Sequence, residues 1–160
     1  MEFKKLSPSA KKVQDTLKTL GFSHQVMELP HTTRSASDAA KAVGCKVGQI
    51  AKSLIFKTKN THKPILVIAS GSNRVNEKKI GNLINEPVEK ADADFVRQKT
   101  GFSIGGVPPV GHLEKLMTFI DEDLMQYKEI WAAGGSPNAV FKLNVLDLVK
   151  MTDGRVVCIK

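Results

Sequence analysis

Residues 49–70 read QIAKSLIFKTKNTHKPILVIAS and contain two segments with the character of β-strands. In the first, QIAKSLIFK (49–57), the alternation of a strand places Ile50, Lys52, Leu54 and Phe56 on one face and the residues between them on the other. The second, PILVIAS (64–70), is apolar almost throughout, which predicts a strand near the centre of a sheet. The fold is therefore expected to be built on a sheet that contains both segments.

Lys52 falls on the same face of the first strand as Ile50, Leu54 and Phe56. A lysine is almost never fully buried unless its ammonium group is paired. The ammonium of Lys52 is therefore expected to reach a cleft, an acidic partner or a bound anion, which makes this residue a functional candidate. The alternative is a lysine near a strand end whose ammonium extends to water.

Helix and turn signals surround these strands on both sides. Helices are predicted after the capping residues Ser7, Ser35, Asn76, Asp92 and Asn144, and three of them end near Gly21, Gly44 and Gly101. Further strands are predicted at 22–29, 116–121, 128–133, 139–143 and 155–159. With no linker or repeat in between, the pattern predicts one α/β domain over residues 1–160 with a mixed sheet.

Composition narrows the class of protein. The longest apolar run, residues 65–69, is far shorter than the roughly 20 residues that cross a membrane, and residues 1–12 lack the apolar core of a signal peptide. The two cysteines, Cys45 and Cys158, have no paired spacing, which suits a reducing compartment. The sequence thus predicts a cytoplasmic protein without a membrane partner.

The positive charge is concentrated in one half of the chain. The net charge is +8; residues 1–80 hold 15 Lys/Arg and 5 Asp/Glu, whereas residues 81–160 hold 9 and 11. A basic half favours an anionic partner such as a nucleic acid. The alternative is an ordinary lysine-rich surface in contact with solvent.

Residues 100–112, TGFSIGGVPPVGH, combine four glycines with two prolines and no acidic side chain. Glycines allow the backbone to approach a ligand closely, and prolines restrict a loop to few shapes. Backbone N–H groups presented in this way suit an oxyanion or phosphate. A tight turn between core strands explains the same composition equally well.

Several familiar chemistries are not supported. GFSIG (101–105) matches the G-x-S-x-G pattern of serine hydrolases, but a predicted helix precedes Ser103 and two prolines follow it, which is the reverse of the required strand–serine–helix context. No metal-binding, P-loop or dinucleotide-binding motif is present. The remaining parts, a rigid loop and a lysine, suit stabilisation of a developing oxyanion, or binding of an anion without catalysis.

Six segments, taken together, resemble the YbaK/ProX family of aminoacyl-tRNA deacylases, which is related to the editing domain of bacterial prolyl-tRNA synthetases. They are SASDAAKAVG (35–44), QIAKSLIF (49–56), RVNEKKI (74–80), RQKTGFSIGGVPPVGH (97–112), FID (119–121) and AAGGSPNAVFKL (132–143). The resemblance implies a compact α/β domain whose sheet curls into a partly open barrel with surrounding helices. It implies hydrolysis, in trans, of the ester that joins a wrong amino acid to tRNA.

The resemblance also assigns roles to residues. It places the family's essential lysine at Lys52, and it implies that backbone groups of the loop position the aminoacyl carbonyl while water and a ribose hydroxyl of the tRNA do the chemistry, without metal or cofactor. The predicted catalytic residues are Lys52, Gly105 and Gly106. The predicted substrate-binding residues are Thr33, Ser70, Val107, Pro108, Pro109, His112 and Asn138.

The expected partners are the aminoacylated end of a tRNA and, as a possible second partner, prolyl-tRNA synthetase or another synthetase. Cysteine-clearing members carry an acidic residue where this chain has Val140, so alanine and serine are as plausible as cysteine. His112 either lines the pocket or is a solvated loop residue. Two other functions stay open: a non-catalytic module that binds tRNA or an anion, and a hydrolase of another small ester that uses Ser103.

Overall fold

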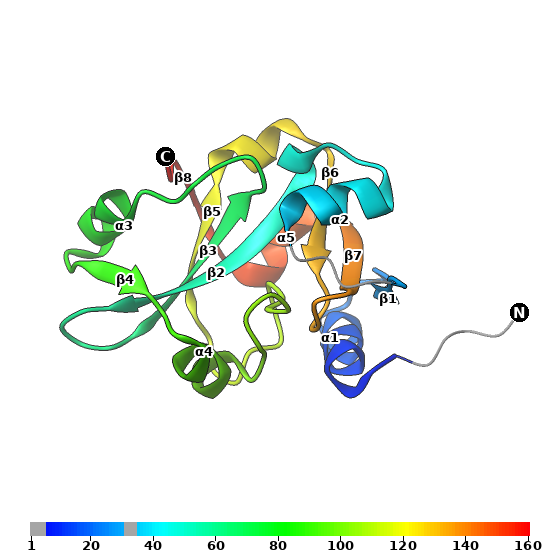
Figure 1. The fold of residues 1–160 in the computed structure, drawn as a ribbon, viewed down its shortest axis with the longest axis horizontal. Helices are drawn as coiled ribbons and strands as arrows, with labels where there is room; N and C mark the ends of the chain where they lie inside the picture. The colour runs from blue at the N-terminus through cyan, green and yellow to red at the C-terminus, as the bar shows by residue number, and fades with distance from the viewer. Residues whose placement is uncertain (1–5, 31–34) are drawn as a thin grey trace, which may run out of the picture.

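The computed structural model describes residues 6–30 and 35–160. Five α-helices lie in these ranges: α1 (Pro8–Thr19), α2 (Ala36–Val43), α3 (Glu77–Ile84), α4 (Ala93–Thr100) and α5 (Val145–Thr152). Eight strands accompany them: β1 (Met27–Glu28), β2 (Ile50–Thr58), β3 (Pro64–Ser70), β4 (Val88–Lys90), β5 (Met117–Asp121), β6 (Glu129–Ala133), β7 (Ala139–Asn144) and β8 (Arg155–Val157). Figure 1 shows their arrangement.

The strands form one mixed sheet in the order β1-β7-β6-β2-β3-β5-β8, with β4 attached to β2. β2 and β3 are antiparallel, whereas β3 pairs with β5, β5 with β8, and β2 with β6 in parallel. The central position of β3 agrees with its apolar sequence, and Val67, Ile68 and Ala69 are fully buried. The predicted α/β class with a mixed sheet is therefore confirmed.

The outer edge of β2 is shared between two short partners. β3 pairs with β2 along residues 51–57, but on the opposite edge β6 reaches only Ile50 and Ala51. β4 then pairs with the far end of β2, at residues 56–58. Among the described residues, the stretch of β2 from residue 52 to residue 55 therefore has no strand partner on this edge.

The predicted helix starts are confirmed at four positions where a side chain accepts a hydrogen bond from a free backbone N–H group. These are Ser35, Asn76, Asp92 and Asn144, and the predicted stops Gly44 and Gly101 adopt left-handed conformations. Each capping side chain lies within three residues of the N–H group that it binds. These helix starts could therefore be predicted without knowledge of the tertiary fold.

The strand prediction at 22–29 was wrong in extent, and one short strand was not predicted. The strand predicted at 22–29 is reduced to β1 (Met27–Glu28), because Gln14 of α1 binds the carbonyl of His24 and the N–H of Val26 through its side chain. β4 was not predicted, since only Val88 of its three residues is buried and its sequence carries no alternating pattern. No helix in the described part of the chain is both long and apolar enough to span a membrane.

Candidate functional site

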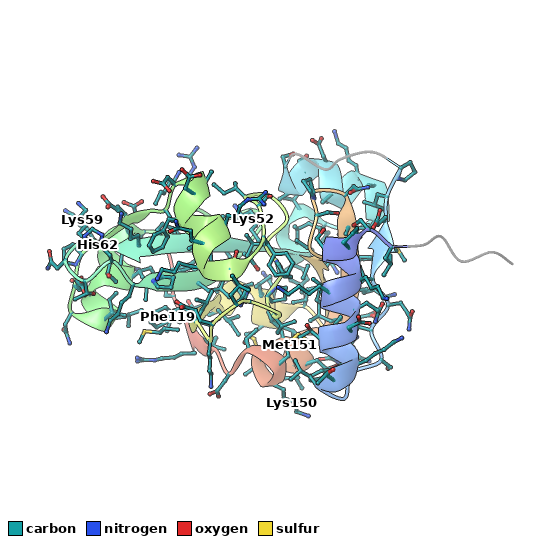
Figure 2. The ribbon with its side chains drawn as sticks, turned by 90° about the horizontal axis from the view of Figure 1, so that it is seen from below. Lys52, Lys59, His62, Phe119, Lys150 and Met151 are labelled. Atoms are coloured by element: carbon teal, nitrogen blue, oxygen red, sulfur yellow. The ribbon has the colours of Figure 1, made fainter. Side chains whose placement is uncertain are left out.

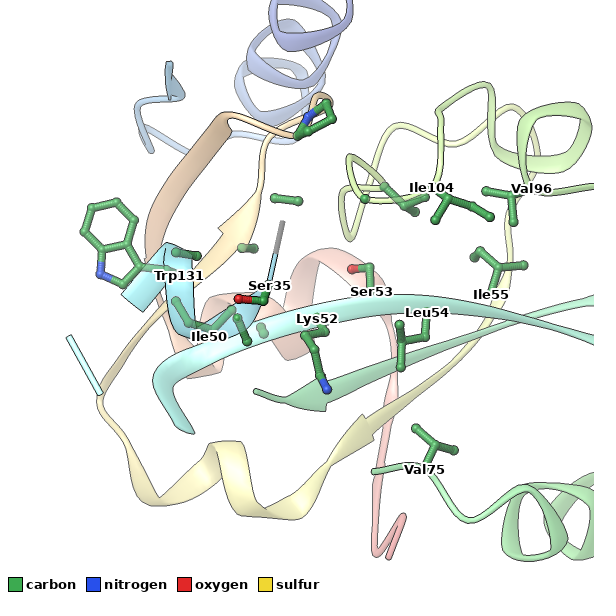
Figure 3. A pocket seen from close by; sticks show the side chains of 18 of the residues that line it. Ser35, Ile50, Lys52, Ser53, Leu54, Ile55, Val75, Val96, Ile104 and Trp131 are labelled. Atoms are coloured by element: carbon green, nitrogen blue, oxygen red, sulfur yellow. The ribbon is translucent and has the colours of Figure 1, made fainter. Parts of the chain in front are cut away.

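A cavity of about 720 Å³ lies along the unpaired edge of β2. β2 contributes every residue from Ile50 to Phe56 to its lining. The remaining walls come from α2, the loop after β3 with the start of α3, the end of β4, α4 with the loop after it, and the β6–β7 hairpin. Figure 3 shows this arrangement, with β2 running between the other elements. The cavity thus exists because β6 and β4 leave the middle of β2 uncovered.

Lys52 and Ser53 point to opposite sides of β2, as the alternation of a strand requires. In Figure 3 Ser53 lies on the side of Ile104, and Lys52 extends away from it toward the loop after β3. Both residues line the cavity, as does Ile104. The cavity therefore reaches around the edge of β2, with Lys52 on one side and the glycine-rich loop on the other.

The ammonium group of Lys52 is held by the loop after β3, where Nζ donates a hydrogen bond to the carbonyl oxygen of Asn73, 3.1 Å away. Asn73 is fixed in turn, because its Nδ2 donates to Oδ2 of Asp121 at 2.8 Å and to Oδ2 of Asp123 at 2.7 Å. Asp121 is fully buried and also accepts the N–H of Ser70 at 2.9 Å. A buried carboxylate at the end of β5 thus determines where the Lys52 ammonium lies.

Burial lowers the pKa of Lys52 below its ordinary value, and the positive charge of Arg74 lowers it further. The negative charge of Asp121 acts in the opposite direction and raises this pKa. Arg74 lines the same cavity. Lys90 and Glu77 also line it, so the cavity holds three cationic side chains and one carboxylate. The positive charges of Lys52 and Arg74, which lie near each other, favour an anionic group at their end of the cavity.

The loop after α4 brings Ile104, Gly105 and Val107 to the cavity. Gly105 has φ of +91°, a conformation that costs other residues steric strain. Gly106 packs so tightly that an added Cβ would lie 2.8 Å from the Cα of Ser136, and its N–H donates to the carbonyl of Ser103. Within the described chain, the N–H groups of Gly105 and Val107 have no backbone acceptor.

The second half of the loop is a buried support. Pro108 and Pro109 are buried and do not line the cavity. His112 binds the carbonyl of Pro108 through Nε2 at 2.6 Å and meets Phe102 edge-on. Burial lowers the pKa of His112 against the opposing effect of the Pro108 hydrogen bond. His112 is thus a packed residue of the loop, and the substrate-binding roles of these three residues stay predictions.

Ser103 lies outside the group of residues that line the cavity. Its Oγ accepts a hydrogen bond from Nη2 of Arg97 at 2.7 Å, and α4 precedes it as the sequence predicted. No histidine or carboxylate within the described residues is hydrogen-bonded to this hydroxyl, so the arrangement lacks the base that a serine nucleophile requires.

The model of the aminoacyl-tRNA editing domain family matches residues 31–151, about three quarters of the sequence. The chain belongs to this family.

Relatives agree with this assignment. The crystal structure of a candidate trans-editing enzyme for prolyl-tRNA synthetase is 46% identical, with a TM-score of 0.93 over 98% of this chain and 99% of that one. EbsC of Enterococcus faecalis, named as a candidate Cys-tRNA(Pro)/Cys-tRNA(Cys) deacylase, is 25% identical over 76% of this chain and 74% of its own. Proline–tRNA ligase of Brachyspira hyodysenteriae is 26% identical over 76% of this chain but only 21% of the ligase.

Three further predicted site residues of this editing domain do not line the cavity or cannot be placed. Ser70 is buried, and its Oγ donates to the carbonyl of Gly48 at 2.8 Å. Asn138, in the β6–β7 hairpin, donates a hydrogen bond from Nδ2 to the carbonyl of Leu29 at 3.0 Å. This bond connects the hairpin to the segment that follows β1. Thr33 lies outside the described residues. The roles predicted for these residues are untested.

The wall that α2, β6 and β7 form in the editing domain is apolar and made mostly of small side chains. It includes Ala36, Ala39, Trp131, Ala132, Ala133, Ala139 and Val140. Val140 thus lines the cavity at the position where the sequence departs from the cysteine-clearing pattern. Sequence reasoning missed Ser53 and Arg74 as cavity residues, because neither interrupts a pattern; for Ser53, the only signal was its place beside Lys52.

Proposed function

We propose that this editing domain hydrolyses, in trans, the ester bond between a small amino acid and a mischarged tRNA. The observation that carries the proposal is that Lys52 and the loop residues Gly105 and Val107 line one cavity from the two sides of the β2 edge. Family membership supports an aminoacyl-tRNA as the substrate. A tRNA substrate would place the protein in the cytoplasm.

In the proposed reaction a water molecule attacks the ester carbonyl carbon and the ribose oxygen leaves with a proton. Negative charge develops on the carbonyl oxygen in the transition state. The proposed donors that stabilise it are the N–H groups of Gly105 and Val107, which have no backbone acceptor among the described residues. The positive charge of Lys52 adds to this stabilisation from the other side of β2. A ribose hydroxyl of the tRNA is the proposed aid to the water, so that no protein nucleophile is needed.

The amino acid is proposed to be small and uncharged, with alanine, serine and cysteine as the candidates. Alanine side chains form much of the wall, and Val140 offers no group that would pair with a polar side chain. The proposed partner is the acceptor end of the tRNA, with prolyl-tRNA synthetase as a possible second partner.

A panel of mischarged tRNAs tests the proposal. Purified protein is incubated with Ala-, Ser- and Cys-tRNA(Pro) and with correctly charged Pro-tRNA(Pro), and release of the amino acid is followed. We expect release from at least one mischarged tRNA and none above background from Pro-tRNA(Pro). Inactivity on the whole panel, together with salt-dependent tRNA binding, would contradict the proposal and favour a non-catalytic binding module. Ser103→Ala is expected to keep full activity, and loss of activity would instead support a serine hydrolase.

A further inference from the structure

The middle of β2 presents main-chain polar groups that no neighbouring strand uses. On the β3 side, the N–H of Gly71 donates to the carbonyl of Ile50, and the N–H of Thr58 donates to the carbonyl of Lys63. The even-numbered residues of β2 therefore direct their backbone N–H and C=O groups toward β3. On the other side, Ala91 N–H donates to the carbonyl of Ile55. The odd-numbered residues therefore direct their backbone groups toward the cavity edge.

The paired parts of this edge stop short of Ser53. β6 pairs only with Ile50 and Ala51, and β4 only with residues 56–58. In the described ranges, the N–H and C=O of Ser53 and the N–H of Ile55 consequently have no ladder partner. Their position on the cavity wall makes them available to a bound molecule.

The side chain of Ser53 is a second and independent sign of a missing partner. Its Oγ is buried and has no hydrogen-bond partner among the described residues. Leaving a buried hydroxyl unsatisfied costs free energy that a ligand with a suitable polar group would recover. Ser53 is also on the side of β2 that faces Ile104 and the glycine-rich loop.

The size of the gap limits what fits there. Residues 52–55 span roughly 13 Å of strand, at about 3.3 Å per residue. β6 and β4 block both ends, so an added peptide strand could not continue past them. A group with the donor and acceptor pattern of a single amino-acid residue fits, and the aminoacyl end of a tRNA has this pattern: an amino group that donates beside a carbonyl that accepts.

We propose that the unpaired edge of β2 at Ser53 binds the α-ammonium group of the aminoacyl end, with the Ser53 carbonyl and Oγ as acceptors. This inference rests on the proposed function for the identity of the ligand. The ammonium then anchors the acyl group on the edge, and its carbonyl lies between Lys52 and the loop. Recognition of a free amino group would exclude N-blocked aminoacyl-tRNAs from the site.

Binding of a non-hydrolysable analogue tests the subsite without need of turnover. The amide 3′-deoxy-3′-(L-alanylamino)adenosine and its N-acetyl derivative are titrated into the full chain by calorimetry. We expect the free amine to bind roughly tenfold more tightly or better, as the loss of a charge-assisted hydrogen bond implies. Ser53→Ala should narrow this preference several-fold without lowering the melting temperature, because it removes an unsatisfied hydroxyl. Ser103→Ala, a serine outside the cavity, is the matched control and should keep the preference.

Equal affinity for the two analogues, binding of neither, or an unchanged preference in folded Ser53→Ala would overturn the subsite. If Ser53→Ala does not fold, the comparison of the two analogues on the unmodified protein still decides. The outcome is separate from that of the mischarged-tRNA panel. Binding that requires the free amine, without hydrolysis, would contradict the proposed function but support the subsite. Equal hydrolysis of free and N-acetylated Ala-tRNA would support the proposed function but contradict the subsite.

Discussion

Lys52 lies where a positive charge is costly, on a strand face shared with large apolar side chains and near a second cation, Arg74. Its ammonium donates to one main-chain carbonyl, that of Asn73, and to no carboxylate among the described residues. A structural lysine would be expected to have an acidic partner in such a place. The arrangement is that of a cation whose remaining hydrogen-bond donors are left for a ligand.

The pH dependence of activity follows from this environment. Because the pKa of Lys52 is lowered, its charge is present at low pH and is lost as pH rises through a value below that of an ordinary lysine. If the charge is needed, kcat/KM falls on this alkaline side. Arg74→Met removes a neighbouring positive charge, so it should raise the pKa of Lys52 and move the fall to higher pH.

The measurement is the pH profile of kcat/KM, corrected for spontaneous ester hydrolysis, for the unmodified protein and for Arg74→Met. The position of the alkaline fall is the readout, since Arg74 lines the cavity and its loss can change the absolute rate. An alkaline fall at the same pH in both proteins would show that it does not report Lys52.

Lys52 could be predicted from sequence because a lysine interrupts an apolar strand face, and this anomaly is visible locally. Ser53 carries no such signal, since a serine on either face of a strand is ordinary. Its importance comes from the absence of a strand partner on one edge, and that depends on where β6 and β4 end. The missing information is the pairing of segments about 30 to 80 residues apart.

At the scale of elements, the loop after β3 is the support of the Lys52 ammonium. Asn73→Ala removes two hydrogen bonds to the carboxylates of Asp121 and Asp123 and leaves the fully buried Asp121 with fewer donors. We expect a loss of roughly 1–3 kcal/mol in the free energy of unfolding. We also expect a lower kcat/KM, because the carbonyl that holds Lys52 loses its fixed position.

Urea unfolding and the hydrolysis assay measure the two effects. Lys160→Ala is the matched control: its ammonium also binds Asp123, 2.9 Å away, but Lys160 is exposed and Asp123 is only half-buried. It should change the unfolding midpoint little and leave kcat/KM unchanged. A similar loss of activity in both variants would show that activity depends on the contacts of Asp123 and not on the hydrogen bond between Asn73 and Asp121.

The helix limits were predictable from caps and stops, which are local, and most strands from their apolar runs. β4 and the shortening of β1 were not, because each depends on a distant partner: the Phe56 end of β2 for β4, and Gln14 for residues 24–26. The loop at 100–112 was predicted to border the binding pocket. In the structure only its first half lines the cavity. The second half is buried, as its prolines and valines allow.

At the scale of the whole molecule, α1 is part of the same folded unit although the family model begins at residue 31. Ala10, Val13 and Leu17 are fully buried in the main core cluster, and the loop after α4 approaches this helix at Gly101 and Gly111. Figure 1 shows this loop between α4 and α1. The helix therefore supports the loop from behind.

Leu17→Ala should lower the free energy of unfolding by about 2–5 kcal/mol, since it leaves a cavity in the core. Leu20→Ala, at the C-terminal cap of the same helix and 48% exposed, should change it by no more than about 0.5 kcal/mol. Chemical denaturation of both variants gives the comparison. Equal effects would show that α1 is not part of the cooperative core.

The account depends most on the claim that Lys52 acts in hydrolysis, and single-turnover cleavage of the mischarged tRNA tests it directly. Lys150, on α5, lies well away from Lys52 and provides a lysine of the same charge as a control (Figure 2). We predict that Lys52→Ala lowers the cleavage rate by roughly 100-fold or more while tRNA affinity changes little, as removal of one transition-state contact does elsewhere. Lys150→Ala should cleave at the unmodified rate. Cleavage by folded Lys52→Ala at the rate of Lys150→Ala would contradict the account.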